Sequence, residues 1–139
     1  SAAPSASHAG VFLLRGNTGM RRVLTNERAI AERLAEHRGF RVLDPMISTV
    51  EEIVNACGGA RIIMGVEGSH LVHGLMVMPP EAVLFVIQPP DRVVSVLKLF
   101  TDRQEQAYAL VVGQGTDEEF SAEWTEIDRT LDLALNRTH

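Results

Sequence analysis

Five short apolar runs, separated by segments with helical spacing, restrict the fold of this sequence more than any other feature. The runs cover residues 10–14, 40–43, 62–66, 82–87 and 108–112. They are rich in Val, Ile, Leu and Phe and show no helical period, which is typical of strands buried on both faces. Alternation of such strands with helices predicts an α/β fold: a doubly wound, mostly parallel five-stranded sheet with helices on both faces.

Helix start and stop signals lie between and after these runs. The first helix is expected to begin at Thr25 or Asn26 and to end at Gly39. A capping box over residues 48–51 predicts that the next helix begins at about Thr49. The other expected helices run from Ser69 to the prolines at 79–80, over residues 91–102, and from Thr116 or Asp117 to Leu135 with an apolar stripe that includes Phe120 and Trp124.

Composition limits the class of protein. The chain has 139 residues, of which 45% are hydrophobic, and this is enough for one core. Residues 1–9 are small and polar and are interpreted as a linker or an expression remnant, so residues 10–139 are expected to form a single α/β domain. The net charge of −5 argues against nucleic acid as the partner.

Cysteine usage and hydropathy bear on the compartment. The single cysteine, Cys57, excludes an internal disulfide framework and a cysteine-based metal site. No apolar run approaches the roughly 18 residues of a membrane span, and the N-terminal residues lack the pattern of a secretory signal. A cytoplasmic protein without a membrane span is therefore expected.

Two polar, glycine-containing segments follow the first and third strands. They are residues 15–17, Arg-Gly-Asn, and residues 67–69, Glu-Gly-Ser. In the strand order 2-1-3-4-5 the first and third strands are neighbours, and a crevice opens at their carboxyl ends. Because glycine allows close approach of the backbone and a helix N-terminus attracts anions, the sequence predicts an anion or nucleotide site there.

Several short motifs in a fixed order resemble glycosyltransferase family 61, whose bacterial members are often described as capsular polysaccharide biosynthesis proteins. The resemblance covers residues 11 to about 88. It implies the C-terminal, Rossmann-like half of a two-domain GT-B enzyme, which holds a nucleotide-sugar donor. The motifs are Leu14-Arg15, Arg21-Arg22, Asn26-Glu27, Gly39-Phe40, Asp44-Pro45 and residues 65–71, Gly-Val-Glu-Gly-Ser-His-Leu.

The resemblance also implies the donor-binding residues. Arg15, Arg21 and Arg22 would neutralise the donor diphosphate, for which the forked guanidinium is well suited. Gly68 and Ser69 would offer backbone N–H groups and a hydroxyl. The predicted donor-binding set is completed by Asn17, Asn26, Glu27, His70 and His73.

Glu67 is the predicted catalytic residue. It stands where many family members have a histidine, and it is the plausible base in the central loop. The resemblance implies an inverting sugar transfer to a hydroxyl of a glycan acceptor, with arginines in place of a metal and no cofactor. His70 and His73 have no recognisable third ligand, so helix capping is a commoner explanation for them than a metal site.

The resemblance also implies a second domain, which binds the acceptor and is expected to lie N-terminal to this chain. Without it, this chain would turn over little or nothing. The alternative is a non-catalytic, flavodoxin-like domain that binds a ligand or a partner. A dinucleotide oxidoreductase is disfavoured, because residues 15–19 do not supply the G-x-G-x-x-G pattern.

Overall fold

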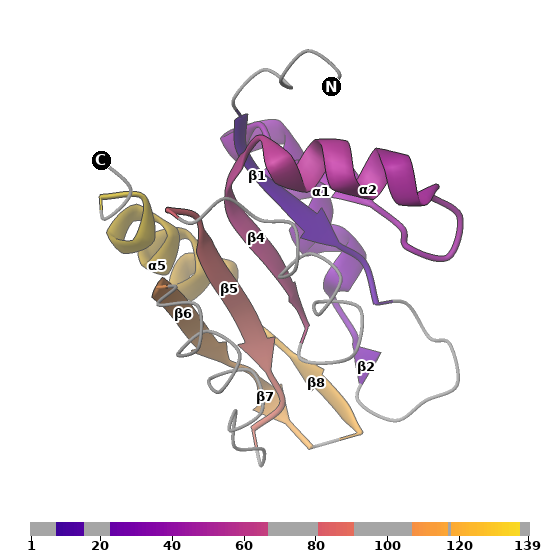
Figure 1. Cartoon of the computed structure of the whole chain (residues 1–139). Coiled ribbons are helices and arrows are strands. Elements are labelled where there is room, and N and C mark those ends of the chain that lie inside the picture. The colour runs from indigo at the N-terminus through magenta and orange to yellow at the C-terminus, as the bar shows by residue number, and fades with distance from the viewer. Residues whose placement is uncertain (1–7, 16–22, 67–80, 91–106, 117, 137–139) are drawn as a thin grey trace.

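The computed structural model describes residues 8–15, 23–66, 81–90, 107–116 and 118–136. Five strands of these segments form one sheet in which all pairs are parallel, in the order β3-β1-β4-β5-β6 (Figure 1). Numbered by their order among the strands of this sheet, they lie in the order 2-1-3-4-5, the order that the expected site at the first and third strands requires. The strands are β1 (His8–Leu13), β3 (Arg41–Leu43), β4 (Ala60–Val66), β5 (Val83–Gln88) and β6 (Ala107–Val112).

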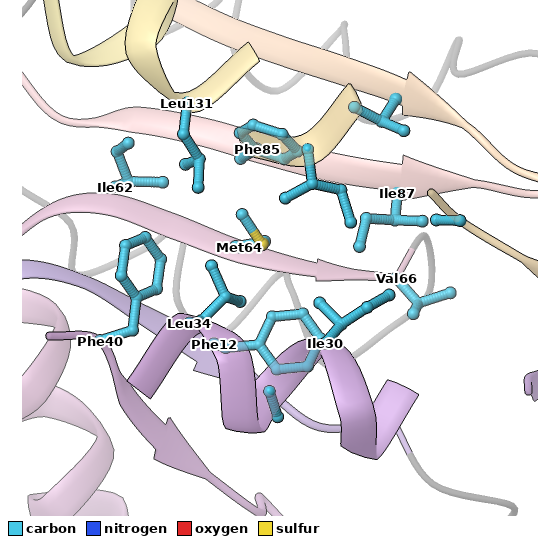
Figure 2. Close-up of a cluster of buried hydrophobic side chains, with 14 of the residues drawn as sticks. Phe12, Ile30, Leu34, Phe40, Ile62, Met64, Val66, Phe85, Ile87 and Leu131 are labelled. Carbon is cyan, nitrogen blue, oxygen red and sulfur yellow. The ribbon is translucent and has the colours of Figure 1, made fainter. Parts of the chain in front are cut away.

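Helices α1 (Glu27–Arg38) and α5 (Trp124–Asn136) cover one face of the sheet. Figure 2 shows Ile30 and Leu34 of α1 and Leu131 of α5 directed at side chains of the central strands. Alternate residues of these strands point to this face because successive side chains of a strand alternate. The strand residues of this cluster include Phe12, Ile62, Met64, Val66, Phe85 and Ile87.

Helix α2 (Val50–Gly58) covers the opposite face. Its Ala56 and Cys57 are fully buried against the other set of strand side chains. Both faces of the central strands are therefore removed from water, as the uninterrupted apolar runs predict. The buried strand residues of this second cluster are Val11, Leu13, Ala60, Ile63, Leu84 and Val86.

The ends of α1 and α2 agree with the sequence signals in position but not in every detail. Gly39 ends α1 in the left-handed conformation, with φ 68°, which glycine adopts without strain. Helix α2 begins after Thr49, and the capping box joins Thr49 to Glu52 rather than Ser48 to Glu51: Glu52 N–H donates to Thr49 Oγ1 (3.1 Å), and Thr49 N–H donates to Glu52 Oε1 (2.7 Å).

The prediction for the last helix is wrong at its beginning. Helix α5 starts at Trp124, and the preceding residues form two short strands, β7 (Gln114–Gly115) and β8 (Glu119–Ser121). Strand β8 pairs antiparallel with β7 and parallel with β2 (Val23–Leu24), and this small sheet lies at the carboxyl ends of the main strands (Figure 1). Phe120 is buried in β8 and belongs to the core cluster under α1 and α5.

Side chains of α1 and α5 tie these helices together. Arg38 Nη2 lies 2.6 Å from Asp128 Oδ1 and 2.8 Å from Asp132 Oδ1, and the Arg33 guanidinium lies 5.6 Å from the centre of the Trp124 ring. None of the helices in the described part of the chain combines the length and apolar character that a membrane span requires. The helices expected over 69–78 and 91–102 lie outside the described residues.

Candidate functional site

The candidate site is the carboxyl edge of the sheet where β1 and β4 are neighbours. Leu13 at the end of β1 is opposite Gly65 of β4 on one side and Leu43 of β3 on the other. After β1, the next strand of the sheet, β3, is added on one side of β1. Strand β4 is then added on the other side, and β5 extends the sheet further in that direction. In doubly wound sheets this reversal separates the connections and leaves a crevice at the carboxyl ends, which is where such folds bind ligands.

Arg15 is half-buried at this edge, two residues beyond the end of β1. Its backbone N–H donates to Glu27 Oε2 at 2.7 Å. Glu27 is the first residue of α1, and only 9% of its surface is exposed. The positive end of the helix dipole favours a carboxylate in this position. The first turn of α1 is thus joined directly to the exit of β1.

Asn26, the N-cap residue of α1, makes no capping hydrogen bond with its side chain. Its Nδ2 donates to Ala122 O at 2.8 Å, and its Oδ1 accepts from Ala122 N at 3.1 Å. Both ends of the amide are therefore engaged with the segment between β8 and α5. The sequence suggested that Asn26 caps the helix or binds the nucleotide-sugar donor. It provided no signal for the pairing with Ala122, because Ala122 lies 96 residues away and contributes only its backbone.

The residues before Asn26 continue the contact with β8. Val23 N–H donates to Glu118 O (2.7 Å), and Thr25 N–H donates to Phe120 O (2.8 Å). The chain that returns to α1 is therefore held by β8 through backbone hydrogen bonds. Sequence reasoning missed these contacts, because a strand of two residues has no readable pattern.

The structure brings together three of the predicted site residues: Arg15, Asn26 and Glu27. The others lie outside the described residues, and their roles stay predictions. They are Asn17, Arg21, Arg22, Glu67, Gly68, Ser69, His70 and His73.

The described segments contain no group of three or more His, Cys, Asp or Glu side chains that could hold a metal ion. Burial raises the pKa of the Cys57 thiol to about 11, with the Arg41 charge opposing the shift, so this cysteine on the buried side of α2 is an inert core residue.

Comparison with known proteins relates the chain to one family and to one fold. The sequence profile of a family described as Glycosyltransferase 61 matches residues 3–85, which is more than half of the chain. Among curated proteins, no sequence matches significantly.

Two solved structures share the fold at low sequence identity. The flavodoxin-like domain of a Synechococcus sp. protein superposes with a TM-score of 0.60 at 9% identity, over 94% of this chain and 96% of that one. A diflavin flavoprotein A3 from Nostoc sp. superposes with a TM-score of 0.57 at 12% identity, over 96% of this chain and 90% of that one. These similarities agree with the flavodoxin-like strand order and concern the fold alone.

Proposed function

Because the chain belongs to glycosyltransferase family 61, we propose that it is the domain of such an enzyme that binds the nucleotide-sugar donor. One observation carries the proposal: the carboxyl ends of β1 and β4 are adjacent at the reversal of the strand order. Both strands lie within the matched residues 3–85. A donor that binds at this edge would meet the polar segments that follow both strands.

Arginines supply the charge in this proposal. Arg15, Arg21 and Arg22 would compensate the negative charge of the donor diphosphate, and Gly68 and Ser69 would donate to its oxygens. No metal ion or other cofactor takes part. The remaining residues of the proposed donor-binding set are Asn17, Asn26, Glu27, His70 and His73.

The proposed reaction is an inverting transfer. An acceptor hydroxyl attacks the anomeric carbon of the sugar, the bond from that carbon to the diphosphate oxygen breaks, and Glu67 takes the hydroxyl proton. The nucleoside diphosphate leaves with the bonding electrons, and the arginines stabilise its charge. The acceptor would be a glycan, held by the separate N-terminal domain of a two-domain GT-B enzyme. This enzyme would act in the synthesis of a bacterial polysaccharide. Without that domain the chain is expected to bind the nucleoside diphosphate, which is the product formed from the donor, but to transfer little or no sugar.

Calorimetry with a panel of uridine, guanosine, thymidine and cytidine diphosphates tests the proposal. At least one is expected to bind in the micromolar to millimolar range. Arg15→Ala is expected to weaken it roughly 10-fold to 100-fold, since a hydrogen bond to a charged group contributes about 1.5–3 kcal/mol.

A charge-matched control separates this effect from general electrostatics. Arg129 is an exposed arginine on α5, and Arg129→Ala should leave binding within about twofold of the wild type. Absence of binding by the whole panel at millimolar concentration contradicts the donor-domain proposal and favours the non-catalytic, flavodoxin-like alternative.

A further inference from the structure

The backbone of Arg15 lies where the pairing of β1 ends. Leu14 N–H donates to Leu43 O at 2.9 Å, and the paired residues of β1 end at Leu13. Continuation along β3 is blocked because Pro45 has no N–H to donate. Arg15 N–H, the next donor of the chain, is taken by the carboxylate of Glu27.

The hydrogen bond from Arg15 N–H to Glu27 is short, and its acceptor is a buried side chain on a well-packed helix. The Arg15 N to Glu27 Oε2 distance of 2.7 Å is at the short end of the range for a backbone N–H donor. Glu27 belongs to the first turn of a 12-residue helix whose Ile30, Ala31 and Leu34 are buried in the core. A carboxylate that is 9% exposed would lose this stabilisation if it moved away from its partners. The backbone that follows β1 is therefore held in place by a helix that is packed in the core.

We propose that Glu27 is a positioning residue of the donor site: it holds the Arg15 backbone so that the Arg15 side chain reaches the donor diphosphate. This inference rests on the function proposed above. The family resemblance places Glu27 in the donor-binding set as an acceptor for Arg21 or Arg22, whereas this inference assigns its carboxylate to the Arg15 backbone. Removal of the carboxylate then weakens donor binding only through Arg15.

The test is a double-mutant cycle with inorganic pyrophosphate and the nucleoside diphosphate panel as probes. Glu27→Ala and Arg15→Ala are each expected to weaken binding about 10-fold or more. The double variant should bind within about twofold of Arg15→Ala alone, because Glu27 has nothing left to position. Glu27→Gln should bind within about threefold of the wild type, since its amide oxygen still accepts from Arg15 N–H.

Stability measurements in the same cycle separate positioning from a merely structural role. Arg15→Ala keeps the backbone N–H, so Glu27→Ala should lower the urea midpoint equally in both backgrounds, while the binding losses are not additive. Multiplication of the two binding losses, to about 100-fold in the double variant, overturns the inference and leaves the proposed function standing. Failure of the wild type to bind any probe overturns both.

The contact can also be tested without a ligand. In wild-type protein the Arg15 amide should be protected from hydrogen exchange, and Glu27→Ala should accelerate its exchange about 10-fold or more, with Glu27→Gln as the folded comparison. Unchanged exchange of this amide in Glu27→Ala overturns the inference regardless of the binding results.

Discussion

The carboxyl ends of β1 and β3 lie side by side in the sheet, yet the chain leaves the two strands in different ways. At the end of β3, Asp44 accepts from Ile47 N and Ser48 N through its carbonyl and from Met46 N through its carboxylate. These partners are two to four residues away, so the segment that follows β3 forms a turn held by hydrogen bonds among its own residues. It leads directly into the capped start of α2.

The β1 exit is closed by distant partners. Arg15 is held by Glu27, which is 12 residues away, and the chain around Asn26 is held by Ala122, which is 96 residues away. A local turn forms whenever its own few residues are ordered, whereas these contacts exist only in the complete fold. The proposed donor edge at the β1 exit therefore depends on the complete fold, whereas the turn that follows β3 is held by its own residues.

The largest effect is expected for Phe120, the core residue of β8. Phe120→Ala should lower the free energy of unfolding by about 3–5 kcal/mol, because the side chain is 2% exposed and its removal leaves a cavity under α1 and α5. Met46, which is 59% exposed at the β3 exit, is the control, and Met46→Ala should change stability by less than about 0.5 kcal/mol. Urea denaturation measures both. Equal losses would contradict the contrast between the two exits.

Asn26→Ala is expected to cost about 2 kcal/mol, since two hydrogen bonds to the backbone of the buried Ala122 are lost. Asn26→Asp keeps the acceptor for Ala122 N but loses the donor to Ala122 O, so its loss should also be clear in urea denaturation. The matched change at the other exit, Asp44→Ala, removes one exposed hydrogen bond and should cost less than about 1 kcal/mol. A greater loss for Asp44→Ala than for Asn26→Ala would reverse the comparison.

The same contrast explains what the sequence could predict. The sequence predicts strand β4 because Ile62, Ile63 and Met64 are consecutive apolar residues in a run that has no helical period, which is typical of a strand buried on both faces. The α/β pattern predicted a parallel sheet and placed Arg15 at a strand exit, but it did not by itself select the strand order, which was assumed as 2-1-3-4-5 and is the order that the structure has.

The contacts of the site were not predictable from the sequence. Phe120 has helical spacing to Trp124 and Ile127, and the sequence interpretation therefore placed it in the last helix. Its pairing with Leu24 in a neighbouring strand decides otherwise, and no local pattern encodes a partner almost one hundred residues away. The side-chain direction of Glu27 was equally hidden, because its acceptor role toward Arg15 requires the fold of β1 against α1.

The pH dependence of the free energy of unfolding is expected to reflect the buried thiol of Cys57 on α2. Below about pH 9 the Cys57 thiol is protonated in both the folded and the unfolded chain. Because burial raises its folded pKa to about 11, the unfolded chain loses the proton first as the pH rises from 9 to 11, and stability falls over this interval. The expected loss is about 1–2 kcal/mol relative to Cys57→Ala, whose own pH profile lacks this component. Identical profiles for the wild type and Cys57→Ala would contradict the burial of the thiol.

The smallest effect is expected at Thr49, whose hydroxyl accepts from Glu52 N–H at the start of α2. Thr49→Ala should cost about 1 kcal/mol in urea denaturation, the usual contribution of an N-cap. Ser48→Ala is the informative control: the sequence suggested a box from Ser48 to Glu51, but the cap is formed by Thr49 and Glu52, so Ser48→Ala should cost less than about 0.5 kcal/mol. Neither change should alter diphosphate binding by more than about twofold, because a turn closed by its own residues transmits little to the β1 exit. A tenfold loss of binding in Thr49→Ala would mean that the two exits act together and that the donor edge includes the start of α2.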